Sequence, residues 1–313
     1  MDTARSLHDH RLVEAEELWN MPFVDRTGFI CRGCAAPVFP ASFTRDVNKR
    51  RPYFTLGKMS RHEAGCDVDG EEQLLHRAQR HRVGASDGFP LPFPSRVVFD
   101  DTHAVEAPRD PAALALAAAR SARLGMGAAR GTGRGVRQRF HGHTIKTIRP
   151  ACRTFIQFPH DRETLPLEIP GLPGRSYARL FHHLGKQAPA FLPLRRQLFY
   201  ACLHWHAEPV LDESVCELAL EAGRGAVPPA QCRLRVEWGG WSKSRRRSFL
   251  RELFAARTEV IEGRGSSDAQ AWVFFIGTQS AADPALFSVG DERFVCCLCA
   301  PASLPTPQRA GTS

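Results

Sequence analysis

Four residues near the N-terminus have the types and the spacing of a metal site. Cys31 and Cys34 lie in FICRGCAAPVFP, where a turn after a short apolar strand would direct both thiolates to one ion. His62 and Cys66 lie four apart in RHEAGC, which would place both on one face of a helical turn. Three cysteines and one histidine fill a tetrahedral shell and leave no position for a reactive water. The sequence therefore predicts one structural Zn²⁺ ion per chain.

Two other interpretations of this segment stay open. The cysteines could be free and buried beside a surface histidine, or His76 or His81 could replace His62 as the fourth ligand. The gap between the two half-motifs is longer than in the commonest zinc fingers. We expect residues 51–56, RPYFTL, to form a strand within that gap. Two half-motifs of metal spacing so close together favour the metal site.

The run from Phe29 to His76 resembles the N-terminal zinc finger of competence CoiA-like proteins, through the stretches CRGC, NKRRPYF, RHEAGC and EEQLLH. In that family a domain resembling a restriction-endonuclease-like nuclease core follows the finger. Such a core uses an Asp/Glu-x-Lys motif to hold a divalent metal and orient water. None of the five lysines has an acidic residue two positions before it. The resemblance thus implies a finger over about 50 of the 313 residues, and the family's nuclease activity is not carried over to this chain, although a degenerate nuclease core stays open.

The positive charge of the chain is concentrated in one segment. Residues 111–160 carry nine Lys or Arg and no Asp or Glu, which equals the formal net charge of +9. A basic flexible strip can follow a phosphate backbone, although a solvated linker with biased composition would look the same. Arginines outnumber lysines 37 to 5, a skew that genome composition can produce. The candidate phosphate contacts here are Arg130, Arg134, Arg137, Arg139, Lys146 and Arg149.

A second basic cluster lies in WGGWSKSRRRSF, where a helix should begin. Cations at a helix N-terminus oppose the macrodipole, and a bound phosphate would reverse that unfavourable interaction. Trp238 and Trp241 could stack on bases, as in single-strand binders, or one could be a core residue beside a solvated turn. The candidate nucleic-acid contacts here are Trp241, Lys243, Arg245, Arg246 and Arg247.

Further histidines and cysteines favour ordinary structural roles. His204 and His206 flank Trp205, and His141 and His143 form a similar pair, but neither pair has a third ligand in register. Strand alternation directs neighbours of FVCCLC to opposite faces, so we expect its cysteines, Cys296, Cys297 and Cys299, to be buried and structural. Nucleophile elbows, phosphate-binding loops and dinucleotide fingerprints are absent from the sequence. These patterns favour a non-enzymatic protein.

Local patterns predict an α+β fold. Short helices are expected over 11–19, 71–82 and 177–184, and a longer one over 244–257. Strands are expected over 96–99, 151–158, 197–207, 214–220, 232–238, 271–277 and 293–299. We therefore predict a zinc-finger module with flanking helices over 1–100 and an Ala/Gly/Arg-rich linker over 101–142. A mostly antiparallel β domain with two helices over 143–302 and a disordered tail over 303–313 would follow. A small barrel, such as an oligonucleotide-binding fold, is among the candidates for the β domain.

The expected compartment and function follow from these features. The N-terminal residues are charged and lack a secretory apolar region, and the longest alanine run is too short to span a bilayer. Metal-type cysteine spacing favours a reducing compartment, so we predict a cytoplasmic, bacterial protein that does not bind membranes. Our leading hypothesis is a zinc-containing protein that binds nucleic acid, DNA rather than RNA. The alternatives are an adaptor that binds a protein through its finger, and a divergent nuclease using Asp100, Asp101 and Glu237.

Overall fold

The computed structural model describes most of the chain outside one long segment. Its described residues are 1–44, 50–84, 88–99, 142–185, 192, 195–204, 206–222, 231–263 and 269–301. Contacts join Met1–Val98 and Gln138–Ser313 into one compact unit, and the second unit, Phe99–Arg137, lies almost wholly outside the described residues. The predicted linker lies outside them too, except for its last residue, as does the predicted tail over 303–313.

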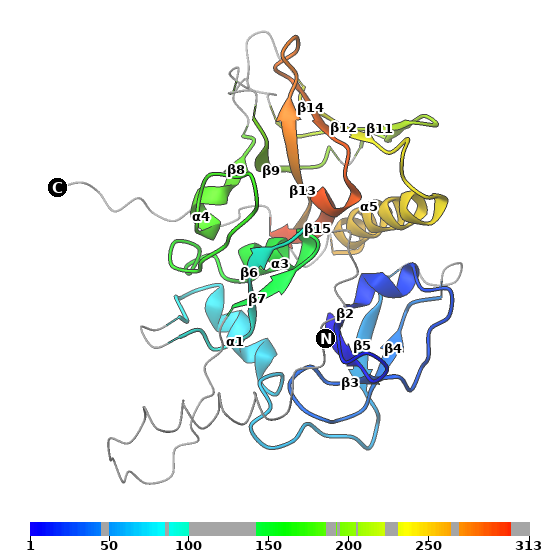
Figure 1. Ribbon diagram of the computed structural model, residues 1–313, viewed down its shortest axis with the longest axis vertical. Coiled ribbons are helices and arrows are strands. Elements are labelled where there is room, and N and C mark those ends of the chain that lie inside the picture. The colour runs from blue at the N-terminus through cyan, green and yellow to red at the C-terminus, as the bar shows by residue number, and fades with distance from the viewer. Residues whose placement is uncertain are drawn as a thin grey trace, which may run out of the picture. The chain divides into compact units, whose positions relative to one another are not determined.

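Short strands build the N-terminal part of the compact unit (Figure 1). The first sheet has the order β2-β1-β3, from β1 (Thr3–Ser6), β2 (Leu12–Glu14) and β3 (Phe29–Ile30). A separate antiparallel pair consists of β4 (Val38–Ala41) and β5 (Tyr53–Leu56), which confirms the strand expected between the two half-motifs. The predicted helix over 11–19 is wrong in its first part, because Leu12–Glu14 pairs with β1. Only Ala15–Trp19 is helical, and it forms the 3-10 helix η1.

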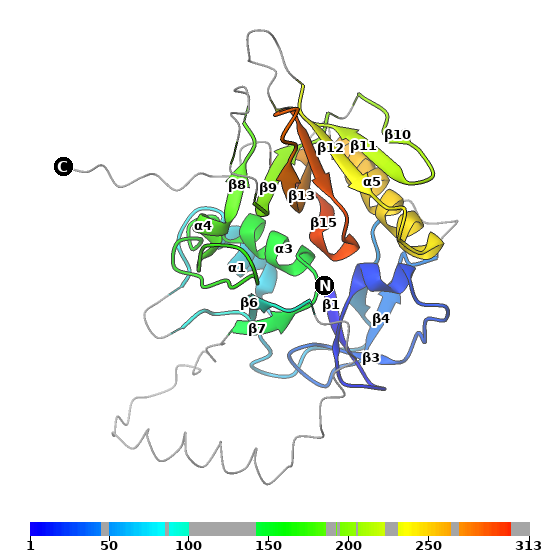
Figure 2. The same cartoon turned by 45° about the horizontal axis from the view of Figure 1, so that its top comes forward.

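One large sheet dominates the rest of the unit (Figures 1 and 2). Its strands are β8 (Phe181–His183), β9 (Gln197–Cys202), β10 (Val210–Leu211), β11 (Val215–Ala219), β12 (Arg233–Glu237), β13 (Ala269–Gln279), β14 (Leu286–Val289) and β15 (Val295–Pro301). They follow the order β10-β11-β12-β14-β13-β9-β8, with β15 also on β13. Since β14 pairs with the end of β13 and β15 with its beginning, these two strands lie end to end along one side of β13. The α+β class is confirmed.

The predicted barrel does not close in the part of the chain that the structure describes. Every pairing in this sheet is antiparallel except β12 with β14 and β8 with β9. Among the described residues, β9 and β11 are linked only by one isolated bridge just beyond their ends, Leu203 to Leu220. The sheet is therefore an open, curled one.

Helices cover the large sheet, and one of them corrects a prediction. Residues 151–158 do not form the predicted strand but lie mostly in α3 (Arg149–Gln157), with Pro150 in the first turn, where its missing N–H is harmless. Ala151, Cys152 and Phe155 are buried at helical spacing, which the run of β-branched and aromatic residues had hidden. The remaining helices are α1 (Glu71–Ala78), α4 (Tyr177–Leu180) and α5 (Lys243–Gly263). The helix expected over 177–184 stops early because Phe181–His183 joins the sheet as β8.

Two strands flank the segment that is not described. They are β6 (Phe93–Val97) and β7 (Gly142–Ile145), which pair in parallel, with a register shift between Pro94 and Arg96. Helix α3 packs against β6 and β15 (Figure 2).

Charged side chains satisfy the outer edge of β15. Cys297 N–H donates to Glu252 Oε1 of α5 at 3.0 Å, and Arg51 Nη2 donates to Cys297 O at 2.7 Å. An unpaired buried peptide group is costly, roughly 1–3 kcal/mol, and exposed edges invite pairing with other chains. Glu252 and Arg51 thus bond the Cys297 peptide groups of β15, with which another strand would otherwise pair.

The same two residues belong to a larger buried ion network. Arg149 of α3 donates to both oxygens of Glu252, at 3.1 and 2.6 Å, and to Glu14 at 3.2 Å. Arg51 also pairs with Glu259 of α5 at 2.8 Å and with Glu16 at 3.5 Å, and Glu16 also accepts from Arg153 of α3. The network therefore ties the N-terminal residues, α3, α5 and β15 to one another.

We expect Glu252→Gln to destabilise the protein strongly. The substitution leaves the Arg149 guanidinium buried without its bidentate partner, and losing one member of a buried pair costs about 3–5 kcal/mol. Urea unfolding followed by tryptophan fluorescence measures the change. Glu208→Gln is the matched control, because Glu208 pairs with Arg257 at an exposed position, and it should leave the midpoint almost unchanged. Equal midpoints for all three proteins would contradict the structural role of Glu252.

The pH dependence of stability should report on Glu16. Burial raises the pKa of this carboxyl, but Arg153, Arg149 and Arg51 together lower it further, to about 2. A depressed carboxyl pKa stabilises the fold above its unfolded value of about 4.5, and this stabilisation is lost as the pH falls towards 2. Its size is on the order of 3 kcal/mol.

We therefore expect Glu16→Gln to be less stable than wild type at pH 7, with a difference that narrows between pH 4.5 and about 2. Burial raises the pKa of Glu14 and of Glu259, and the Glu16 charge adds to both shifts, so the opposite pH trend of these two carboxyls is weaker in the variant and reduces the difference at pH 7. Urea unfolding at several pH values tests this, with the exposed Glu72→Gln as control. A stability difference between wild type and Glu16→Gln that does not depend on pH would refute the low pKa of Glu16.

Candidate metal centre

The structure brings the four predicted ligands together into one cluster. Their donor atoms all lie within 4.8 Å of one another; the residues are Cys31, Cys34, His62 and Cys66. Cys31 Sγ is 3.7 Å from Cys66 Sγ, and His62 Nδ1 is 3.5 Å from Cys34 Sγ and 3.6 Å from Cys66 Sγ. Cys31 and Cys66 are buried, whereas Cys34 and His62 are half-buried.

These separations can be compared with the edges of a coordination tetrahedron. Metal–sulfur bonds of about 2.3 Å and metal–nitrogen bonds of about 2.05 Å give edges of about 3.8 Å between sulfurs and about 3.5 Å between sulfur and nitrogen. The 3.7 Å Cys31–Cys66 distance and the two distances from His62 match these edges. Three of the six edges thus match a tetrahedral site, and the other three separations are within 4.8 Å.

Backbone amides surround the three sulfurs. Cys31 Sγ accepts from Gly33 N–H at 3.4 Å. The amides of Ala36 and Glu63 act to lower the pKa of Cys34, and that of Val68 acts to lower the pKa of Cys66. Such N–H donors stabilise thiolates, the form in which cysteine binds metal.

The thiols differ in how readily they lose their protons. Burial, aided by the neighbouring thiols, raises the pKa of Cys66 to about 12. Burial also raises the pKa of Cys34, but the Glu63 amide and His62 lower it more, to about 7. Binding of a cation would release the remaining protons.

Two glycines allow the loops to approach each other. A Cβ on Gly33 would collide with the Asp67 carboxylate and lie 3.1 Å from Cys66 Sγ. Gly65 has a φ of +84°, a left-handed conformation that favours glycine, and it directly precedes Cys66. The predicted helical turn is absent here: Cys66 N–H donates to Glu63 O in a simple turn. The alternative ligands His76 and His81 are not part of the cluster.

Arg32 links the cluster to helix α1. It lies between the first two ligands, and its guanidinium is 2.9 Å from Glu71 and 3.8 Å from Asp67. Sequence analysis did not single out Asp67 or this ion pair. The position of an arginine inside Cys-x-x-Cys and of acids after the last cysteine was the available signal, but their proximity depends on the fold of the loops.

Comparison of the chain with protein-family models, curated proteins and solved structures finds no match. The resemblance of residues 29–76 to the CoiA-like finger therefore stays an expectation from short motifs. No helix within the described ranges is both long and apolar enough to cross a membrane.

The predicted phosphate contacts of the basic segment fall into three groups. Arg130, Arg134, Arg137 and Arg139 lie outside the described residues. Lys146 follows β7 and is exposed. Arg149 is a correction, because its side chain is only 16% exposed and is held by Glu252 and Glu14. Its charge is neutralised inside the protein and is not available to a phosphate.

The second basic cluster is also divided. Arg246 donates to three carbonyls, those of Trp241, Glu213 and Gly239, and so organises the loops before α5. Arg245 pairs with Glu292 at 3.2 Å, whereas Lys243 and Arg247 are exposed. The prediction of Arg246 as a phosphate contact is therefore corrected, because its guanidinium is held by backbone carbonyls, and Lys243 and Arg247 stay predicted contacts.

The two tryptophans of this cluster are anchored by their indole N–H groups. Trp238 is 4% exposed and donates to Asp212 O, so it is not a stacking surface. Trp241 is half-buried, donates to Gly290 O at 2.7 Å and packs edge-on against Phe249. Trp241 therefore offers only part of its ring.

The remaining candidates gain no support as sites. Cys296 and Cys297 are fully buried and Cys299 is half-buried, which confirms a structural placement for the first two. His204 and His206 have ring centroids 6.1 Å apart and belong to no ligand cluster in the described chain. Glu237 is exposed at the end of β12, and Asp100 and Asp101 lie outside the described residues.

We expect Gly33→Ala to weaken metal binding by roughly 10–100-fold, the range seen when groups around a metal site are disturbed. The new methyl group would push Asp67 and Cys66 away from the other ligands. Competition with a chromophoric chelator measures the affinity. Gly240→Ala is the control, since nothing lies within 4 Å of its Cβ position. Unchanged affinity in Gly33→Ala would show that the cluster does not bind the metal.

Proposed function

We propose that the cluster binds one structural Zn²⁺ and that the protein is a non-enzymatic, nucleic-acid-binding protein. The single observation that supports the metal is the tetrahedral spacing of the Cys3His donors. Thiolates and imidazole favour Zn²⁺, and four protein ligands leave no open position for catalysis. The bound ion would tie together the loops that carry the four ligands, two of which, Cys31 and Cys66, also belong to the hydrophobic core of the N-terminal part.

Nucleic-acid binding is supported by the placement of positive charge. The excess between residues 111 and 160 has no acidic residue within it, and although Arg149 and Arg153 pair internally, Lys146 is exposed. At the beginning of α5, Lys243 and Arg247 are exposed beside Trp241. A phosphate there would meet two cations and the positive end of the dipole of a 21-residue helix, in which Arg245 N–H already donates to Ser242 Oγ.

A protein-interaction adaptor is the second candidate, because large apolar side chains are exposed on the N-terminal part. Phe23 is 79% exposed and Met59 is 97% exposed. The others in this part are Leu7, Leu12 and Tyr53. Exposed apolar groups on a small rigid module suit a protein partner.

Metal analysis and a nucleic-acid titration on one preparation test the leading proposal. We expect one zinc per chain, and affinity for labelled single- or double-stranded DNA that falls as salt rises. Lys243→Ala with Arg247→Ala should lower the slope of log K against log salt by about one per lost phosphate contact. Lys58→Ala, an exposed lysine in the N-terminal part, is the control.

The outcomes separate the candidates. Binding that is independent of salt, or no binding of DNA or RNA, would refute the nucleic-acid proposal. A full complement of zinc in a protein that binds no nucleic acid would favour the adaptor.

A further inference from the structure

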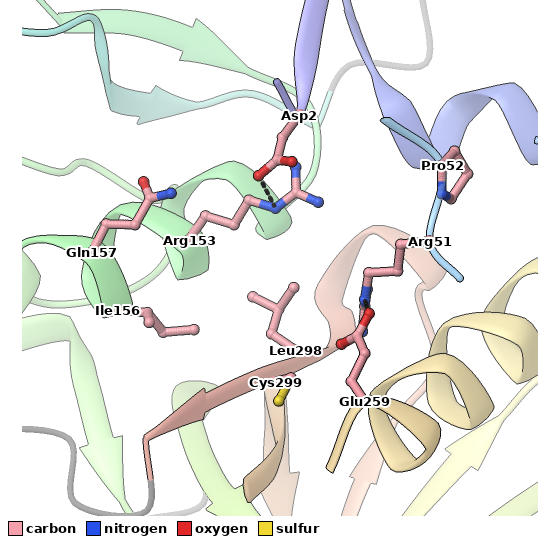
Figure 3. Close-up of a pocket in the computed structure, with 9 residues that line it drawn as sticks. All are labelled: Asp2, Arg51, Pro52, Arg153, Ile156, Gln157, Glu259, Leu298 and Cys299. Atoms are coloured by element: carbon pink, nitrogen blue, oxygen red, sulfur yellow. Dashed lines mark hydrogen bonds and ion pairs between the residues drawn. The ribbon is translucent and has the colours of Figure 1, made fainter. Parts of the chain in front are cut away.

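A cavity of about 260 Å³ lies where the N-terminal residues, α3, α5 and β15 meet (Figure 3). One face of α3 supplies Arg153, Ile156 and Gln157, which are spaced as neighbours on a helix. Asp2 lies beside Arg153 at one side of the cavity, and Arg51 and Glu259 lie at the other, with Leu298 between the two pairs. Polar groups therefore line opposite ends of a cavity with an apolar floor.

The two ion pairs of the cavity differ in how firmly they are made. Every nitrogen of the Arg51 guanidinium has a partner: Nε pairs with Glu259, Nη1 with Glu16, and Nη2 with backbone carbonyls. Arg153 is anchored by Glu16, but its Nε lies 3.7 Å from Asp2 Oδ2, too far for a hydrogen bond. Its Nη1 donates to no group among the described residues, and the Asp2 side chain is 54% exposed.

The loose Arg153–Asp2 pair offers both signs of charge to a ligand. A simple anion at Arg153 would compete with Asp2, and a simple cation at Asp2 would approach Arg153, so either alone meets a like charge. A ligand with an ammonium next to a carboxylate avoids both conflicts. Its carboxylate would face the Arg153 guanidinium and its ammonium would face Asp2, which completes a ring of alternating charges. The side-chain amide of Gln157 lies on the same helix face and also lines the cavity.

The apolar floor and the volume set the rest of the ligand. Ile156, Leu298 and the Cys299 thiol can accommodate a short apolar chain. Ligand pockets commonly span about 300–1,000 Å³, so this cavity suits a small molecule. We propose that it binds a free α-amino acid with an apolar side chain. The proposal is independent of zinc and of nucleic-acid binding.

Calorimetric titration of the full chain with L-leucine tests the proposal, with any affinity tag at the C-terminus because the Met1 ammonium donates to Phe54 O. Two analogues each lack one charge: 4-methylpentanoate has no ammonium, and 3-methylbutylamine has no carboxylate. We expect saturable binding of L-leucine and at least about tenfold weaker binding of both analogues. No binding of L-leucine at about 10 mM, or equal binding of either analogue, would overturn the proposal.

Variants locate the binding in the cavity. Asp2→Asn should weaken L-leucine binding at least about tenfold without lowering the melting temperature, because Asp2 forms no tight bond in the free protein. Asp9→Asn, which removes an exposed partner of Arg11, is the matched control and should bind normally. Ile156→Phe should abolish binding by filling the cavity. Normal binding in both Asp2→Asn and Ile156→Phe would place the ligand elsewhere and refute the site, while DNA affinity should be the same in all variants.

Discussion

The packing of the compact unit depends on the hydrogen bonds that Glu252 and Arg51 make to the N–H and C=O of Cys297. Cys297 lies on an edge of β15 that pairs with none of the described strands, and its N–H and C=O are bonded by Glu252 and Arg51 instead. Each of these side chains brings its own partner, Arg149 for Glu252 and Glu259 for Arg51. Arg51 is about 250 positions from Cys297 in the sequence, so satisfying one peptide group also fixes where the N-terminal residues pack. The charges are buried where their mutual attraction is strong and where the loss of one member leaves the others uncompensated.

This arrangement explains why charge counting along the sequence was only partly successful. The sequence predicts one basic strip between residues 111 and 160, yet Arg149 and Arg153 project from α3 into the buried network. Their partners Glu252 and Glu16 are more than 100 residues away in opposite directions along the chain. Local composition cannot show that such acids meet such bases, because the pairing follows from how α3 and α5 pack. Arg246 shows the same limit of sequence reasoning, because its three acceptors are backbone carbonyls and local composition cannot identify them.

Secondary structure and the metal cluster were more accessible to sequence reasoning. Most strands of the large sheet were predicted because alternation and β-branched residues are local signals, and Cys31, Cys34, His62 and Cys66 were found because ligand spacing is local as well. Helix α3 was missed because Thr154, Phe155 and Ile156 favour a strand by type, while packing against the sheet selects a helix. The surroundings of the metal cluster, Asp67 against Gly33 above all, arise from two loops that meet only in the folded chain. Closure of the barrel likewise depends on a pairing between distant strands, and composition carries no information about it.

The parallel pairing of β6 with β7 has a consequence for how this protein could vary. Val97 pairs with Ile145 and Phe93 with Gly142, so the chain between the two strands leaves from one fixed place and returns to another. The entropic cost of closing such a connection rises only with the logarithm of its length, so doubling the number of residues adds about 0.6 kcal/mol to the free energy. A change in the number of residues between the two strands would therefore alter the entropic cost of closing the connection by little. Selection could lengthen, shorten or recharge this stretch for whatever partner it serves, while the sheet and the metal cluster stay under separate constraints.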